Sequence, residues 1–351
     1  MEKMSIKFLE ELMSTASPSG FETEVQRVVL NRMKKCSDRV DIDVLGNLIG
    51  IINPKGQPKI MLAGHCDEVG LIVQHINDNG YLYFQKIGGT YLPALHTQRV
   101  NIITSKGRVP GVIGRKKGLS TEVPQSFPVE SLWIDIGVRN RKEAEKLVSI
   151  GDPITFATNF QKLPNNLVLS KGFDDKISVF AITEIFARLY KTKFAPSIFG
   201  VSTVQEELGT RGATTSSYTI NPDVGIAIDV TEATDYPDMD KRSKGEVALG
   251  KGPVLYRGAN INPVIGNLLI ETAKNLNIPH QIGAVAGPTG TDARAIQIIR
   301  GGVATALISV PLRYMHTSGE IISLDDVENI VKLVVEVVKK IKKGMDFIPL
   351  K

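Results

Sequence analysis

The chain has 351 residues, of which 42% are hydrophobic and 23% are charged, as in a globular protein with one large domain or two smaller ones. The net charge is only +5, with no basic stripe interleaved with aromatic residues, so the sequence gives no indication of nucleic-acid binding. No apolar run is long enough to span a membrane, the acidic N-terminal segment is unlike a signal peptide, and two unpaired cysteines exclude a disulfide scaffold. We therefore expect a cytoplasmic protein without a membrane partner.

The N-terminal part of the chain predicts two helices followed by strands. Apolar residues recur at helical spacing in residues 5–15 and 21–35. Residues 39–56 alternate and end at a Pro-Lys-Gly turn, which indicates one or two hairpin strands. The short apolar run 59–64 predicts a buried strand.

The character of the chain changes between about residues 70 and 165. The segments there are short, rich in β-formers and punctuated by glycine, with one plausible helix at 140–151. This pattern predicts a small β domain with its own organisation.

From about residue 172 helical and strand patterns alternate again. We expect helices at 174–190, 263–276 and 291–299, a helix or loop at 209–218, and strands at 197–204, 223–229, 280–285 and 302–310. A last helix is capped by Ser323 and ends at Gly344. Alternation of this kind indicates a mostly parallel α/β sheet with helices on both faces. We predict a catalytic domain formed by 1–68 and 166–351, interrupted by an inserted β-rich domain at 69–165.

Metal-ligand side chains follow one apolar strand after another. Ligands of open α/β sheets bind at the carboxyl ends of the strands, where such residues meet. Five strand or helix ends supply an imidazole or a carboxylate here. These residues are His65, Asp67, Asp174, Asp175, Glu206, Glu207, Asp229 and His316. Each alone has an ordinary structural explanation, but together they predict a metal site at one edge of the sheet.

Imidazole and carboxylate together suit zinc, cobalt or manganese. Two histidines and three carboxylates are enough for two metals about 3.5–4 Å apart if one carboxylate bridges them. Neighbouring residues that leave a strand point in different directions, so one of Glu206 and Glu207 can bind metal while the other acts as a general base on the attacking water. Asp67, two residues after His65, is placed to hold the second ring nitrogen of that histidine.

The sequence resembles the glutamyl and deblocking aminopeptidase family of dinuclear metallopeptidases, the tetrahedral aminopeptidases, some of which are named endoglucanase or cellulase M. The resemblance runs nearly end to end, including residues 134–156 of the expected insertion. It is carried by the motifs AGHCDEVG (63–70), GFDDKIS (172–178), VQEELGTRGA (204–213), AIDVTEATDYPD (227–238), GPTGTDA (287–293) and MHTSGE (315–320).

This resemblance implies a zinc-peptidase-like α/β domain, an inserted domain used for dimerisation, and dimers that assemble into a dodecamer. It also implies removal of N-terminal residues from peptides with two zinc or cobalt ions per subunit. The metal ligands it implies are His65, Asp174, Glu207, Asp229 and His316. Asp174 would be the bridging ligand in preference to Asp175, Glu206 the general base, and Asp67 the residue that tunes His65. Two segments of the insertion depart from the family pattern, Thr97 in place of an expected glycine and the altered loop 112–124.

Three further residues are candidates for substrate contact. Thr289 and Asp292 lie in the GPTGTDA loop, where they either line the pocket and hold the peptide N-terminus or form a turn and helix cap. Arg313, close to His316, either contacts substrate or forms a surface ion pair.

Two other functions remain open. Two carboxylates can hydrolyse a glycosidic bond, but the two histidines would then have no role. A non-catalytic scaffold with a relic metal site is the other alternative, and the presence of Glu206 argues against it.

Overall fold

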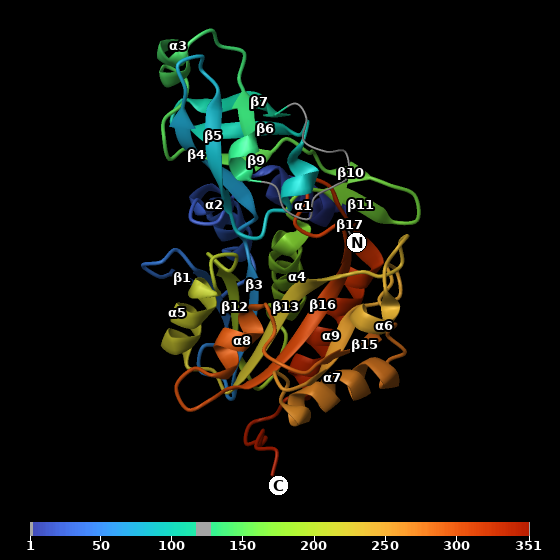
Figure 1. Ribbon diagram of the computed structural model, residues 1–351. Coiled ribbons are helices and arrows are strands. Elements are labelled where there is room, and N and C mark those ends of the chain that lie inside the picture. The colour runs from blue at the N-terminus through green and yellow to red at the C-terminus, as the bar shows by residue number, and fades with distance from the viewer. Residues whose placement is uncertain (1–2, 117–127, 351) are drawn as a thin grey trace.

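The structure, a computed structural model, describes residues 3–116 and 128–350 and has a large mixed α/β part below a smaller β part (Figure 1). Its α-helices are α1 (Lys3–Ser14), α2 (Thr23–Met33), α3 (Arg141–Glu145), α4 (Phe173–Leu189), α5 (Arg211–Ile220), α6 (Lys241–Lys244), α7 (Pro263–Asn275), α8 (Asp292–Gln297) and α9 (Leu324–Lys340). Two short 3₁₀ helices, η1 (Leu92–Leu95) and η2 (Val129–Ser131), lie in the β part.

The large sheet has 11 strands among the described residues, and its centre is parallel. Its strands are β1 (Arg39–Ile42), β2 (Leu48–Ile52), β3 (Lys59–His65), β10 (Gln161–Lys162), β11 (Leu167–Ser170), β12 (Ser197–Thr203), β13 (Val224–Glu232), β14 (Val254–Gly258), β15 (Gln281–Val285), β16 (Ala304–Arg313) and β17 (Glu320–Ser323). The order β12-β3-β13-β16 is parallel throughout, so these four strands end at the same edge.

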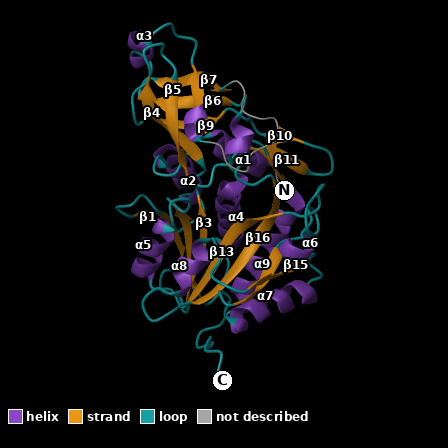
Figure 2. Ribbon diagram, in the orientation of Figure 1, coloured by secondary structure: helices purple, strands orange, loops and turns teal. Residues whose placement is uncertain are grey.

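Helices cover both faces of this sheet (Figure 2). This is expected for central strands that are apolar on both sides. In β3, Ile60 and Leu62 belong to the larger core, which α1, α2, α4, α7 and α9 cover. The alternating residues Met61 and Ala63 point to the other core, which α5 and α8 cover. The expected fold class, a mostly parallel sheet between two helical layers, is confirmed.

The smaller part is a closed barrel with a core of its own. Its strands, in the order β4-β5-β8-β7-β6-β9, are β4 (Gly70–Ile76), β5 (Leu82–Ile87), β6 (Arg99–Thr104), β7 (Gly107–Arg115), β8 (Leu132–Asp135) and β9 (Pro153–Phe156). Thr97 has a φ of +64°, a left-handed conformation that glycine adopts without cost. After the barrel, the chain returns to the large sheet at β10. The altered loop 112–124 lies largely outside the described residues.

Several elements differ from the expectation. The segment 209–218, left open as helix or loop, is helical as α5, and α9 ends at Lys340 rather than at Gly344, because Ile341 is extended and buried. Strands β14 and β17 were not predicted, since they are short and gain their stability from pairing with β16. No helix within residues 3–116 and 128–350 is long and apolar enough to cross a membrane.

Candidate metal centre

The side chains singled out in the sequence converge at the carboxyl edge of the parallel strands. His65 ends β3, Asp229 lies in β13, and Glu206 and Glu207 follow β12. His316 lies just beyond β16, and Asp174 and Asp175 open α4, where a cis peptide bond joins them. Most of these side chains are buried although they are polar, with His65 only 1% exposed. Burial of so many ionisable groups at one edge is expected when they share a ligand.

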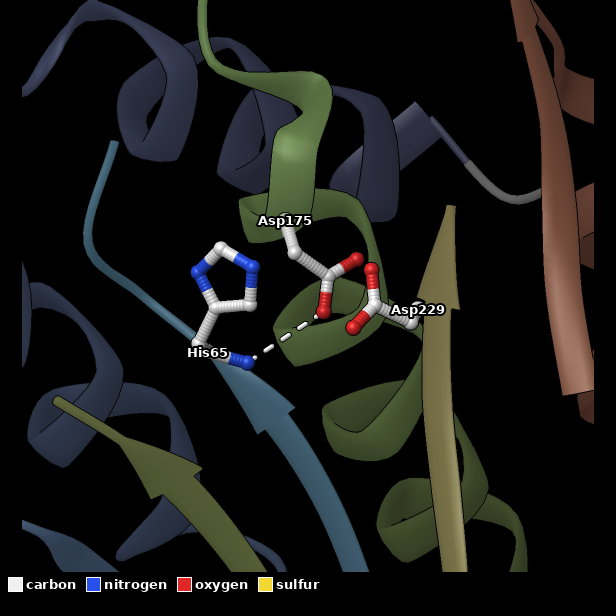
Figure 3. A group of neighbouring side chains, drawn as sticks. All are labelled: His65, Asp175 and Asp229. Carbon is white, nitrogen blue, oxygen red and sulfur yellow. Dashed lines mark hydrogen bonds between the residues drawn. The ribbon is translucent and has the colours of Figure 1, made fainter. Parts of the chain in front are cut away.

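Two groups of side chains are close enough to hold a metal ion each. One group consists of His65, Asp175 and Asp229 (Figure 3). Its candidate ligand atoms all lie within 4.8 Å of one another, as do those of the second group. The other consists of Asp174, Glu207 and His316.

Asp174 lies between the two histidines. Its Oδ1 is 3.1 Å from His65 Nε2, and its Oδ2 is 3.2 Å from His316 Nε2. One carboxylate thus presents a separate oxygen to each histidine, which is the arrangement that a bridging ligand needs. Asp175 differs, because its Oδ2 accepts from the His65 amide at 3.2 Å (Figure 3). Its Oδ1 accepts from the Ser178 hydroxyl.

The two neighbouring glutamates occupy different positions. Glu207 Oε1 is 3.6 Å from His316 Nε2 and has no hydrogen-bond partner among the described residues, although it is buried. Glu206 belongs to neither of these two groups, which we call the metal-type groups. Its Oε2 is 3.9 Å from His65 Nε2. Gln205, just before them, has a φ of +55°, a conformation that non-glycine residues rarely adopt outside special sites.

Asp67 holds this turn in place. Its Oδ1 accepts from the Glu206 amide at 3.0 Å, and its Oδ2 accepts from the Glu207 amide at 3.1 Å. The ring Nδ1 of His65 lies 3.0 Å from the Asp67 carbonyl oxygen and 3.4 Å from its Oδ1. Asp67 therefore fixes His65 and both glutamates at once, through its backbone as well as its carboxylate.

The electrostatics of the site fit bound cations. Burial raises the pKa of Asp229 well above its usual range, and the Asp174 carboxylate adds to this. Burial, with Asp229 and Asp292 nearby, also raises the pKa of Glu206, and bound cations would lower this pKa again because they favour the charged carboxylate. The pKa of Asp174 moves the other way, because hydrogen bonds from His316 and His65 outweigh its burial. The crowded buried carboxylates, with Glu207 Oε1 lacking a partner in the described chain, and the two histidines together offer the oxygen and nitrogen donors that suit metals such as zinc or cobalt.

Glu320 belongs to this site but was not assigned from the sequence. It is 1% exposed, its Oε2 accepts from the Asp174 amide at 3.2 Å, and its Oε1 accepts from the His316 amide at 3.2 Å. The only sequence signal was its place four residues after His316 in the motif MHTSGE.

The barrel also reaches the site, through two glycines after β5. A Cβ on Gly88 would lie 2.8 Å from Glu207 Oε2, and one on Gly89 would lie 2.7 Å from His316 Nδ1. The adjacent Tyr91 amide donates to the His316 carbonyl oxygen at 3.3 Å. The glycine pair therefore lets the barrel pack directly against the two side chains.

Gly89→Ala should lower the affinity for zinc about 10–100-fold, the scale seen when a group that orients a metal ligand is changed. The added methyl group would displace the His316 imidazole. Titration of the chelator-stripped protein with zinc measures the effect. Gly301→Ala is the matched control, because no atom lies within 4 Å of a Cβ there. Equal affinities for the two variants would contradict the prediction.

The three candidate substrate residues do not all line the same cavity. A cavity of about 660 Å³ is lined by Glu206, Gly290, Thr291 and every residue of the two groups except Asp175. Thr289 lines an adjoining cavity of about 610 Å³. Asp292 is 2% exposed, and its Oδ2 accepts from the Thr203 hydroxyl at 2.6 Å. Both Nε and a terminal nitrogen of Arg313 lie 2.7 Å from the Asp235 carboxylate, which favours the ion-pair alternative for this arginine.

Comparison with known proteins gives the family of the chain. The sequence profile described as M42 glutamyl aminopeptidase matches residues 46–333. The lysyl aminopeptidase of Pyrococcus furiosus is 37% identical over 351 residues, covering 98% of this chain and 99% of the relative. The TET aminopeptidase of a Thaumarchaeota archaeon from marine sediment superposes with a TM-score of 0.91 at 34% identity, covering 97% of both chains.

A second solved structure bears on assembly. The TET1 peptidase of Pyrococcus horikoshii, described as assembling into a tetrahedron or a large octahedral shell, superposes with a TM-score of 0.84 at 31% identity. The alignment covers 96% of this chain and 100% of that one. The family resemblance noted in the sequence is confirmed: the chain belongs to the M42 family of glutamyl aminopeptidases.

Proposed function

We propose that this chain is an aminopeptidase that removes N-terminal residues from peptides with two divalent metal ions, zinc or cobalt. The observation that carries the proposal is the position of Asp174, which presents one oxygen to His65 and the other to His316. The proposed ligands are His65, Asp174, Glu207, Asp229 and His316, with Asp174 shared.

When bound, the metal pair would polarise the peptide carbonyl, acidify the attacking water and stabilise the developing oxyanion. Glu206 takes the proton from that water and returns it to the leaving amine. Its place in the cavity but outside both metal-type groups supports this role. Asp67 keeps Glu206 and Glu207 in their separate positions by accepting from both amides.

On the substrate side, we propose that the loop with Thr289 and Asp292 borders the bound peptide N-terminus. Gly290 and Thr291 line both cavities, which supports a contact with the first residue of the substrate. The Asp292 Oδ1 atom is buried without a hydrogen-bond partner in the described chain.

We further propose that the chain acts in the cytoplasm as a homo-oligomer, with the inserted domain 69–165 as the dimerisation surface and a dodecamer as the full assembly. The P. horikoshii relative, which assembles into closed shells, supports the oligomer. The barrel has a hydrophobic core of its own, which supports its proposed role as a separate unit that docks on a partner subunit.

The glycosidase alternative is less favoured by the site. Both histidines face the same carboxylate, an arrangement that a pair of acid and base carboxylates does not require. The relic-scaffold alternative conflicts with the presence of Glu206 in the cavity.

The test is to strip the protein with a chelator, restore it with zinc or cobalt, and assay aminoacyl chromogenic substrates. Activity should vanish on stripping, return with metal, and be confined to substrates with a free N-terminus. N-blocked peptides and cellulose are the matched negatives. Hydrolysis of either of these, or activity that survives complete removal of metal, would overturn the proposal.

A further inference from the structure

Behind the metal centre lies a buried charge cluster that the proposed mechanism does not use. It consists of Glu68, Lys171 and Lys176, whose side chains are at most 5% exposed. Both Glu68 oxygens lie 2.7 Å from Lys171 Nζ, and Glu68 Oε2 lies 2.9 Å from Lys176 Nζ.

Stability alone does not account for this cluster. Two lysines share one glutamate, so the cluster by itself carries an excess of positive charge. Apolar residues of similar volume are often as stabilising as a buried ion pair. The cost is visible in Lys171, where burial outweighs the attraction of Glu68 and lowers the pKa to about 8.

The position of the cluster points to the metal site. Lys171 and Lys176 stand on either side of the turn that carries Asp174. Gly172 in this turn has a φ of +63°, and a Cβ there would collide with Glu68 Oε2, so the turn lies directly against the glutamate. The two lysines thus place positive charge immediately behind a turn whose carboxylates face the metal-binding edge.

Glu68 also joins three separate segments of the chain. It accepts from the Ser17 amide at 3.1 Å and from the Thr155 hydroxyl of barrel strand β9 at 2.9 Å. Lys176 Nζ donates to the Thr15 carbonyl oxygen at 2.9 Å. The Asp174 turn is therefore anchored from behind to the segment after α1 and to the barrel, while its carboxylate stays free to face the two histidines.

We propose that Glu68, Lys171 and Lys176 form a positioning cluster that holds the Asp174 turn in its metal-binding conformation before any metal arrives. The inference rests on the proposed role of Asp174 as a metal ligand. It extends that role to three residues that are not among the proposed ligands and do not line the cavity at the metal centre. It also makes the docking of the barrel part of the same support.

The first test compares Lys171→Met with Arg32→Met. Arg32 pairs with Glu184 at 2.7 Å and is also mostly buried, and Glu184 lies on α4 far from the Asp174 turn. Both variants lose a cation from an ion pair, so both should lower the melting temperature. Only Lys171→Met should weaken zinc binding, by about 10–100-fold, in titrations of the stripped full-length protein with zinc alone.

The outcomes separate the cluster from the proposed function. If the wild-type chain binds no zinc, the metal function fails and the cluster has nothing to position. If the wild-type chain binds zinc and both variants bind it equally well, only the positioning role is overturned.

A second measurement needs no variant and so does not depend on whether Lys171→Met folds. Hydrogen exchange of residues 171–176 is followed in the wild-type protein with and without zinc. The cluster predicts slow exchange already in the stripped protein, because the turn is held by the lysines and Glu68. Fast exchange that slows only when zinc is added would overturn the proposal.

Discussion

Glu206→Gln should lower kcat by about 10²–10⁴-fold, the usual contribution of a general base, which corresponds to about 3–5 kcal/mol of barrier. The amide has nearly the same shape as the carboxylate but cannot take a proton from water. Because Glu206 lies outside both metal-type groups, the metal content of the variant should stay that of the wild-type chain. Turnover of an aminoacyl substrate and the zinc content per subunit are the two measurements.

The adjacent Glu207 provides the matched control for this experiment. Glu207→Gln makes the same chemical change one residue away, in a side chain whose Oε1 is 3.6 Å from His316 Nε2. This variant should lose zinc as well as activity. Full activity in Glu206→Gln, or a loss of zinc from it, would contradict the separate roles assigned to the two glutamates.

Asp174→Asn should have the second large effect, because it alters the one carboxylate that faces both histidines. An amide nitrogen would replace one of the two oxygens. We expect zinc affinity to fall by more than the roughly 10–100-fold typical of residues that only orient a ligand. Activity should fall with it, and zinc titration with metal analysis measures the change.

Asp175→Asn is the neighbouring comparison. Both oxygens of Asp175 accept hydrogen bonds from the protein, so this variant should lose about 1–3 kcal/mol of stability through an unsatisfied donor. It should still bind zinc better than Asp174→Asn. A reversed order of affinities would make Asp175, which groups with His65 and Asp229, the shared ligand.

The sequence was informative about this site for a definite physical reason. His65, Glu206, Glu207, Asp229 and His316 each lie at or after the end of an apolar run long enough to identify a buried strand, whereas Asp174 and Asp175 open a helix. Parallel strands bring their carboxyl ends together. His65 at the end of β3 and Glu206 after β12 could therefore be placed at the same edge of the sheet from the sequence, and the structure pairs these two strands in parallel.

Other parts of the site depend on contacts that no local pattern encodes. Gly89 reaches His316 only because the barrel docks on the α/β domain, and Glu68 meets Lys171 across the whole inserted domain. Glu320 accepts hydrogen bonds from two backbone amides. Because almost every residue has such an amide, these partners leave no signal in the sequence. Strand β17 escaped prediction for a similar reason, because its few residues are ordered by pairing with β11 and β16.

The wide spacing of the proposed ligands along the chain has a consequence for synthesis. His65 is made early, and the entire barrel is then made before Asp174. His316, which follows β16, is the last of the proposed ligands to leave the ribosome. A growing chain or a fragment that stops before β16 therefore lacks His316 and with it part of the proposed centre, so the proposed hydrolysis requires synthesis to pass β16.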